Sequence, residues 1–332
     1  MILIAAVILV QLSPLLPLGA QESRPSKLVE AARKEGKLVW YTSTSIEDAK
    51  SLVDAFNKKY PFVRTEFFRA GSAGLLNRIV NEARIGKLFF DVVAIRGLET
   101  HQLIQGGLLQ PYFSPESKAY PAGFKHPKGL WVDYFDAYQV IGYHTRLVPK
   151  DQVPKSYDDL LHPRWKGKIG MDEDLYSWYG ALVQKWGKER AHRFMKGLAR
   201  QEIQFRSGQT LVAQLLAAGE FTVAMVLAHR IEKMKERGAP VEWVTTLDPI
   251  AASLHPIGLA ARAPNPNTGK LFIDFVLSKE GQKLVLDIGR TPARSGIDPK
   301  MDAKNLKLYP VPPESGENYS QYLKEFREIF GR

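Results

Sequence analysis

The sequence predicts an α/β protein built of two lobes joined by a hinge. Two series of strand–loop–helix units of similar size, at 38–105 and 169–237, are separated by a stretch of different character. Such alternation implies parallel sheets that are covered by helices on both faces. The 332 residues suit two domains or one large one, and 45% of them are hydrophobic, so the chain can bury a substantial core.

The N-terminus has the order of a secretory signal peptide. The first 19 residues carry no charged side chain, and the apolar block 2–10 is shorter than the roughly 20 residues that cross a bilayer. Two prolines end the block, and Ala20 offers a small residue for cleavage. We therefore predict a signal peptide at 1–20 and an exported mature protein. No basic residue precedes the block and Leu18 is large for its position, so an uncleaved anchor is the alternative.

The first series begins after a short helix and contains three strands. Helical spacing of apolar side chains identifies its helices, as at Ala49, Leu52 and Phe56. The expected strands are 38–41, 63–68 and 89–95, and the expected helices begin near 45, 72 and 100.

The second series follows a region rich in Pro, Gly, Tyr and Phe at 107–127. Two strands, 130–135 and 138–143, come first, and the chain is expected to cross between the lobes near 133–139. The remaining expected elements are strands at 169–171, 203–205, 221–227, 241–245 and 257–260, and helices at 177–186, 188–198, 231–237 and 269–277, with further helices from 207 and 278. Lobe 1 then comprises 27–132 plus about 250–300, lobe 2 comprises 133–249, and a mostly polar tail, 301–332, packs on the lobes.

The charge balance is basic, with 46 Lys and Arg against 35 Asp and Glu and a formal net charge of +11. Nucleic acid, an anionic membrane or small acidic ligands can each account for such an excess. Basic residues alternate with acidic ones, as in 233–237 (KMKER), and the aromatics lack an RNA-binding strand pattern, which argues against nucleic acid. A generally basic surface is the simplest explanation.

Common catalytic and cofactor motifs are absent from the sequence. It lacks G-x-x-x-x-G-K-[ST], G-x-G-x-x-G, G-x-S-x-G and H-E-x-x-H, and it contains no cysteine, which excludes disulfides and thiol chemistry. Its seven histidines show no convincing metal-ligand spacing. We therefore assign no catalytic residue, no cofactor and no metal ligand.

Candidate ligand contacts lie after the predicted strands, because ligands of open α/β sheets bind beyond the carboxyl ends of the strands. In lobe 1 these are Thr42, Ser43, Ser72 and Arg96. The hydroxyl groups can donate to a ligand or simply cap the following helices. The guanidinium of Arg96 suits a carboxylate or phosphonate, and a surface ion pair is its alternative role.

Lobe 2 offers Ser177, Trp178 and Tyr179 at one strand-to-helix junction and His229 with Arg230 at another. Clustered aromatic rings at the end of a strand can wall a ligand pocket, although core packing is the more common role of each ring alone. His229 is likewise either a ligand contact or a structural histidine.

Five stretches carry a family resemblance: 38–43 (LVWYTS), 91–96 (DVVAIR), 163–169 (PRWKGKI), 263–282 and 289–296 (GRTPARSG). They resemble type II periplasmic substrate-binding proteins of ABC importers, specifically the iron(III)-binding-protein-like branch of solute-binding family 1. The resemblance implies two Rossmann-like lobes that close on a ligand about a two-strand hinge. It also implies a monomer in the periplasm that delivers its ligand to an inner-membrane permease without catalysis.

The resemblance also bears on the ligand. Iron binders of this family carry a tandem tyrosine pair at the end of the strand before the last helix of lobe 2, and a carboxylate ligand after the third strand. The matching positions here are Ala228, His229 and Arg96. Since a guanidinium repels Fe(III), the resemblance favours an organic anion, a carboxylate or phosphonate. The expected ligand contacts are Thr42, Ser43, Ser72, Arg96, Ser177, Trp178, Tyr179 and His229. Iron is the alternative ligand, and an enzyme on the same frame is a third possibility.

Overall fold

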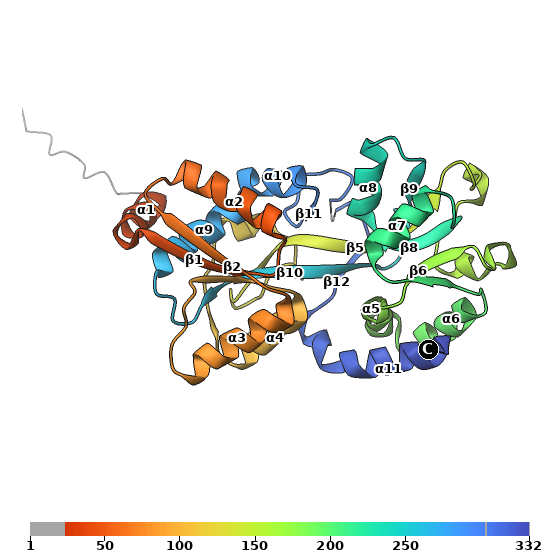
Figure 1. Ribbon diagram of the computed structural model, residues 1–332, viewed down its shortest axis with the longest axis horizontal. Helices are drawn as coiled ribbons and strands as arrows, with labels where there is room; N and C mark the ends of the chain where they lie inside the picture. The colour runs from red at the N-terminus through yellow and green to blue at the C-terminus, as the bar shows by residue number, and fades with distance from the viewer. Residues whose placement is uncertain (1–23, 303, 332) are drawn as a thin grey trace, which may run out of the picture.

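The computed structural model describes residues 24–302 and 304–331. The predicted signal peptide lies outside these residues. Within them, no helix combines the length and the apolar character needed to cross a bilayer. Figure 1 shows an elongated molecule of two α/β halves side by side, with α1–α4, α9 and α10 in the left half and α5–α8 in the right.

Helices and strands alternate through both halves, as predicted. In the described residues the α-helices are α1 (Arg24–Glu35), α2 (Ile46–Lys59), α3 (Ser72–Arg84), α4 (Gly97–Gln105), α5 (Tyr176–Trp186), α6 (Lys188–Ala199), α7 (Gln209–Ala217), α8 (Ala228–Glu236), α9 (Pro266–Leu277), α10 (Lys279–Asp287) and α11 (Tyr319–Phe330). The strands are β1 (Lys37–Thr42), β2 (Arg64–Arg69), β3 (Val92–Ala94), β4 (Leu109–Gln110), β5 (Val132–His144), β6 (Ile169–Asp172), β7 (Gln204–Arg206), β8 (Val223–Leu227), β9 (Val241–Trp243), β10 (Ile250–Ala260), β11 (Thr291–Pro292) and β12 (Leu308–Pro310).

The strands form one hydrogen-bonded path in the order β2-β1-β3-β10-β5-β8-β6-β7. In lobe 1, β1 runs parallel to β2 and β3, and β10 pairs antiparallel with β3. In lobe 2, β6 runs parallel to β7 and β8, and β5 pairs antiparallel with β8. Each lobe is therefore a mostly parallel sheet closed by one antiparallel strand.

Two long strands, β5 and β10, join the lobes (Figure 1). They pair from Ala251↔Gln139 to Ile257↔Val132, with an irregularity between Leu254 and Pro256. The two strands predicted at 130–135 and 138–143 are thus one strand, and the strand predicted at 257–260 begins at Ile250. The predicted lobe boundaries, 132/133 and 249/250, fall at the starts of these strands.

Side chains of β1 explain how the lobe 1 sheet is covered on both faces. Successive residues of a strand point to opposite faces. Trp40 packs against Phe272 of α9, with ring centroids 5.1 Å apart, while its neighbour Tyr41 packs against Phe90, at 4.8 Å, in a second cluster beneath α3. Burial on both faces holds the carboxyl end of β1 and the loop after it in place.

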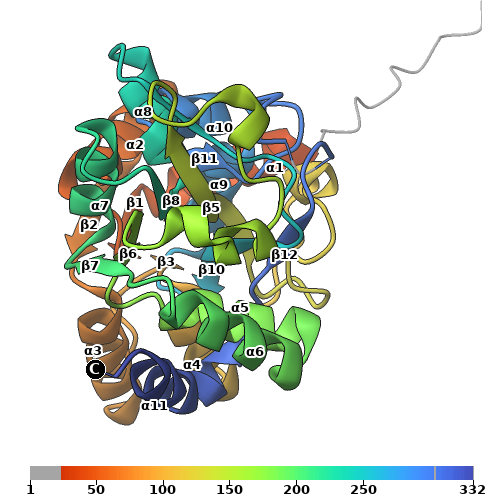
Figure 2. The ribbon, with the colours of Figure 1, turned by 90° about the vertical axis from the view of Figure 1, so that its right-hand side faces the viewer.

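The C-terminal segment contacts both lobes. β12 pairs with β10, and the 3-10 helix η5 (Pro313–Asn318) packs on α4 of lobe 1. α11 then packs on α5 and α6 of lobe 2, where it buries Tyr322 and Phe326 (Figure 2). The tail predicted as mostly polar therefore contains an amphipathic helix and crosses from one lobe to the other.

A candidate ligand site between the lobes

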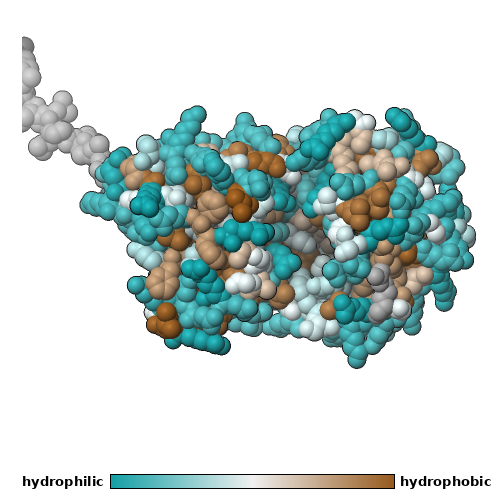
Figure 3. All heavy atoms as spheres, in the orientation of Figure 1, coloured by the Kyte–Doolittle hydropathy of each residue, from teal (hydrophilic) through white to brown (hydrophobic). Residues whose placement is uncertain are grey.

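The carboxyl ends of the parallel strands in both lobes face a crevice between them, and Figure 3 shows a hollow where the halves meet. A cavity of about 270 Å³ lies in this region. Its walls come from α4 and the residue before it in lobe 1, from the β6–α5 junction in lobe 2, from β10 and from the C-terminal segment. The cavity is therefore built from both lobes and from a strand of the hinge.

Arg96 and Ser177 line this cavity from opposite lobes, together with Asp174, His255 and Tyr319. The sequence-based expectation placed Arg96 and Ser177 at the same site from separate strand ends, and the fold brings them to one cavity. Ser177 lies in the first turn of α5, whose N-terminus has no side-chain cap. The free N–H groups of such a turn attract negative charge.

Arg96 has an ion pair of its own. Its Nη2 lies 3.0 Å from Oε1 of Glu99, and its side chain is 61% exposed. Arg96 is also the N-cap residue of α4, with no side-chain hydrogen bond capping that helix. The ion pair considered for Arg96 is therefore present, while its contact with a ligand stays a prediction for a residue that lines the cavity.

His229 and Arg230 stand in the first turn of α8, which begins at Ala228, three residues earlier than predicted. Burial, reinforced by the charges of Arg230 and Arg290, lowers the pKa of His229 to about 3. Burial and then Arg290 also lower the pKa of Arg230. Nε of Arg230 and Nδ1 of His229 are buried and have no hydrogen-bond partner among residues 24–302 and 304–331.

His255 of β10 belongs to the same electrostatic cluster. Burial, followed by Arg290, Arg96 and His229, lowers its pKa to about 3. Its ring stacks on Phe135 with centroids 4.1 Å apart. Both histidines are therefore neutral at pH 7, and the cations around them are Arg96, Arg230, Arg290 and Lys233.

The hydroxyl groups predicted in lobe 1 lie at the end of β1 (Thr42), in the loop after it (Ser43) and at the start of α3 (Ser72), and none of them is among the residues that line the cavity. Oγ1 of Thr42 accepts a hydrogen bond from the backbone N–H of Thr44 at 3.1 Å, and Thr42 is fully buried, so its side chain supports the loop. Oγ of Ser43 is buried without a hydrogen-bond partner in the described part of the chain. Ser72 is buried as the first residue of α3. Ser43 thus has the clearest unused hydrogen-bonding capacity.

Trp178 and Tyr179 do not line the cavity, which corrects the expectation that they close over a ligand. The Trp178 ring packs against Tyr157 and Phe194 in the lobe 2 core. Tyr179 donates from its hydroxyl to Glu325 of α11 at 2.7 Å. The first turn of α5 directs these two rings toward α6 and α11, whereas Ser177 faces the cavity.

Three residues at or near the cavity were not assigned as ligand contacts from the sequence: His255, which lines it, and Arg230 and Arg290, which lie close to His229. The sequence did point to the two arginines, because Arg230 adjoins the predicted contact His229 and Arg290 lies in the 289–296 stretch of the family resemblance. No sequence pattern pointed to His255, because the first half of β10 was not predicted as a strand.

The positions that match the iron ligands of the family are occupied by Ala228, His229 and Arg96, as expected. The methyl group of Ala228 cannot ligate a metal. Among the described residues there is no group of three or more His, Asp or Glu side chains that could hold a metal ion.

Two α/β lobes, a two-strand hinge and a crevice between the lobes define a solute-binding protein. Residues 91–312 match the family described as bacterial extracellular solute-binding protein, and the chain belongs to this family. The predicted membership of the type II periplasmic binding proteins related to Fe(3+)-binding proteins is thereby confirmed.

Known relatives cover most of the chain. An uncharacterized protein of Haemophilus influenzae is 29% identical over 267 residues, 76% of each chain. The periplasmic binding protein AfuA from Actinobacillus pleuropneumoniae, solved with exogenous fructose-6-phosphate bound, is 26% identical, with a TM-score of 0.69 over 89% of this chain and 99% of that one. Iron-bound HitA from Pseudomonas aeruginosa is 20% identical, with a TM-score of 0.74 over 88% and 99% of the two chains.

Proposed function

We propose that this protein is the extracytoplasmic receptor of an ABC importer and that it captures a small organic anion, a carboxylate, phosphonate or phosphate ester, between its lobes. The observation that carries the proposal is the grouping of three arginines around the cavity wall: Arg96 lines the cavity, Arg290 acts together with it on the pKa of His255 in the wall, and Arg290 also acts on the pKa of Arg230. Only Arg96 and Arg290 have carboxylate partners there, Glu99 and Asp48.

Among these three arginines, Arg230 is expected to contribute the most binding free energy when it pairs with an anionic ligand. Its buried Nε lacks a hydrogen-bond partner within the described residues, and burial lowers its pKa. A buried, unpaired charge is costly, so an anion that pairs with it gains a large part of that cost as binding free energy. Bidentate pairing with a guanidinium favours carboxylate and phosphate groups in particular.

The backbone of α8 adds to this preference. His229 and Arg230 lie in its first turn, and its N-cap, Leu227, provides no side-chain hydrogen bond. The N–H groups there are available to an anion, and the helix dipole has its positive end at this point. A neutral His229 can donate one further hydrogen bond from its ring.

The relatives support an anionic ligand in two ways. AfuA, whose structure contains fructose-6-phosphate, has the same fold and 26% identity to this chain. HitA, which was solved with iron, is more distant in sequence, at 20% identity. Iron is the second candidate, and a guanidinium at position 96 and a methyl group at 228 count against it because neither can donate to Fe(III).

In this role the protein releases its ligand unchanged to a permease in the inner membrane and acts as a periplasmic monomer. Recovery of intact ligand after prolonged incubation would separate a receptor from an enzyme on the same frame.

Isothermal titration of the mature protein with fructose 6-phosphate, 2-aminoethylphosphonate, citrate and ferric citrate tests the proposal. We expect at least one of the first three to bind, and Arg230→Ala to weaken that binding by at least about tenfold, since a charge-assisted bond is lost. Arg237→Ala, at the exposed C-terminal end of the same helix, is the matched control. Binding of ferric iron alone, or equal affinity in both variants, would contradict the proposal.

A further inference from the structure

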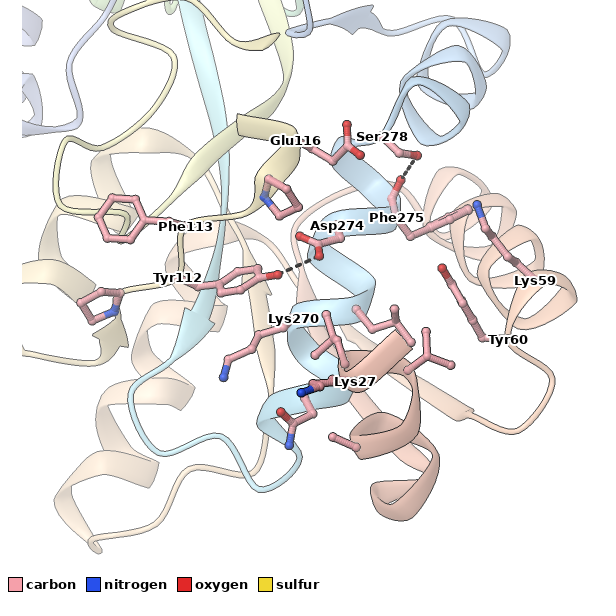
Figure 4. A pocket seen from close by; sticks show the side chains of 17 residues that line it. Lys27, Lys59, Tyr60, Tyr112, Phe113, Glu116, Lys270, Asp274, Phe275 and Ser278 are labelled. Atoms are coloured by element: carbon pink, nitrogen blue, oxygen red, sulfur yellow. Dashed lines mark hydrogen bonds between the residues drawn. The ribbon is translucent and has the colours of Figure 1, made fainter. Parts of the chain in front are cut away.

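A second and larger cavity, of about 670 Å³, lies in lobe 1 away from the crevice. It is bounded by α1, by α9 and by the segment 111–116 (Figure 4). It has no lining residue in common with the crevice cavity. Its volume falls within the range of about 300 to 1,000 Å³ that is typical of small-molecule sites.

The cavity has a largely aromatic and apolar wall. Tyr112 and Phe113 stand on one side and Phe275 of α9 on the other, and Leu271 of α9 is a further lining residue. The Phe113 side chain is 59% exposed, among the highest fractions for large hydrophobic residues in the described chain. An exposed aromatic ring beside a cavity of this size provides a contact surface for an apolar ligand.

The aromatic wall is fixed in place before any ligand arrives. Tyr112 donates from its hydroxyl to Oδ2 of Asp274 at 2.7 Å, as the dashed line in Figure 4 marks. The Phe113 ring lies against Gly129, which has φ +69°, and a Cβ at that position would come within 3.1 Å of the ring. A larger residue than Gly129 would therefore displace the ring, and the present arrangement holds it over the cavity.

The acidic side chains of the wall already have partners. Asp274 also accepts a hydrogen bond from Ser114 at 2.6 Å, and Glu116 accepts one from Arg294 at 2.6 Å. Lys59 is likewise paired, with Glu280 at 2.5 Å. Glu116 and Lys59 are therefore paired with opposite charges, and Asp274 accepts hydrogen bonds from two hydroxyl groups.

Two lysines of the wall have no ion-pair partner within the described part of the chain. Lys27 of α1 and Lys270 of α9 have no carboxylate within ion-pair distance among residues 24–302 and 304–331. They stand on helices that pack against each other, and Figure 4 shows both at the same end of the cavity. The Lys270 ammonium lies 5.9 Å from the centre of the Tyr112 ring. The net field of the cavity is therefore positive, next to an apolar surface.

We propose that this cavity is a second binding site, which takes an amphipathic organic anion. The acid group would pair with Lys27 and Lys270, and the apolar body would lie against Tyr112, Phe113 and Leu271. Charge complementarity selects the acid group, and the aromatic wall selects an apolar or aromatic body over the polar anions suited to the crevice. This site does not depend on the proposed crevice function.

Fluorescence titration with 8-anilino-1-naphthalenesulfonate, an aromatic sulfonate, tests the site in the mature protein. We expect one saturable site that the double variant Lys27→Ala/Lys270→Ala weakens at least tenfold and that Phe113→Ser also weakens. The matched control is Lys304→Ala/Lys324→Ala, which removes two exposed lysines elsewhere. Decanoate should displace the probe, whereas 1-decanol, with the same chain and no charge, should not.

Three results would overturn the inference. The first is unchanged probe affinity in both the lysine variant and Phe113→Ser. The second is equal displacement by decanoate and 1-decanol, which would indicate an apolar surface without anion selectivity. The third is loss of the probe in Arg230→Ala, which would place it in the crevice. Lys270→Gln, which keeps a polar side chain of similar length, distinguishes loss of the charge from loss of packing. The melting temperature of each variant verifies that it is folded.

Discussion

Arg290 donates from both Nε and Nη2 to the same oxygen of Asp48, at 2.9 and 2.7 Å. The pair joins the residue that precedes β11 to the first turn of α2, and the guanidinium lies 5.4 Å from the centre of the Phe135 ring. Arg290 also lowers the pKa of both His229 and His255. Asp48 therefore fixes in position one of the cations that shape the electrostatics of the crevice.

Asp48→Asn should destabilise the protein by about 1 to 3 kcal/mol, because both side chains are mostly buried and the charge of Arg290 would lose its partner. Urea unfolding at pH 7 measures this change. Asp54→Asn on the same helix removes an exposed pair with Lys50 and should change the unfolding free energy by less than about 0.5 kcal/mol. Similar losses in the two variants would show that the Arg290 pair contributes no more than a surface one.

Arg96→Ala and Ser177→Ala should each weaken anion binding, with the larger loss, about tenfold or more, from Arg96, since its interaction is charge-assisted. The two residues line one cavity from opposite lobes. A ligand that bridges them requires both lobes, so the double variant should lose less than the sum of the single losses in binding free energy. Titration calorimetry on the four proteins measures the coupling. Strictly additive effects would mean that the two residues do not contact the same bound molecule.

The alternation of elements could be predicted because apolar spacing reflects local geometry. This spacing was sufficient to predict both series of strands and helices. It also predicted that Arg96 and Ser177 stand at the ends of strands. The hinge strand β5 was predicted as two strands with a break at 136–137, where the buried polar residue Asp136 interrupts the apolar run. α11 was missed because its apolar side is recognisable only against the lobe 2 surface that it covers.

Site prediction was limited by side-chain direction. A strand end specifies which residues stand near the crevice, but it does not specify which way the first turn of the next helix points them. Ser177 faces the cavity, whereas Tyr179, two residues further, points to Glu325. The importance of Arg290 depends on Asp48, 242 residues away in the sequence, and no local pattern encodes such a contact.

Gly180→Ala should detach α11 from lobe 2. A Cβ at position 180 would lie 2.5 Å from the ring of Tyr322, so α11 would have to move. Because Tyr322 and Phe326 are buried beneath this helix, the expected cost is about 1 to 3 kcal/mol, as for other overpacked sites. Thermal unfolding measures the loss. Gly187 has open space at its Cβ position but a positive φ, so it is unsuitable as a control. Ala181→Gly removes a buried methyl group and lowers helix propensity, and it gives the cost of these two effects without overpacking.

Asp133 and Asp136 are fully buried on the hinge strand β5. Between Pro256↔Asp133 and Leu254↔Asp136 one residue of β10 opposes two of β5, and this bulge brings the two carboxyl groups to one side. Burial raises the pKa of both carboxyl groups, and the proximity of the other carboxyl further raises that of Asp133. We therefore expect the pair to hold at least one proton at neutral pH, where unfolded aspartates are ionised.

Asp136→Asn should become progressively more stable relative to the parent as the pH rises from 4.5 to 7.5. Above the unfolded pKa of about 4, the native pair binds more protons than the unfolded chain, so the parent loses up to about 1.4 kcal/mol per pH unit for each retained proton. The neutral amide removes the contribution of Asp136, whereas that of Asp133, whose pKa is also raised by burial, remains in both proteins. His229 and His255, whose native pKa values are lowered to about 3, contribute the opposite slope below pH 6.5, but they do so in both proteins and cancel in the difference. Urea unfolding at four pH values gives the comparison, with Asp54→Asn as the exposed control. A difference that stays constant across this range would mean that the hinge carboxyl groups titrate as they do in the unfolded chain.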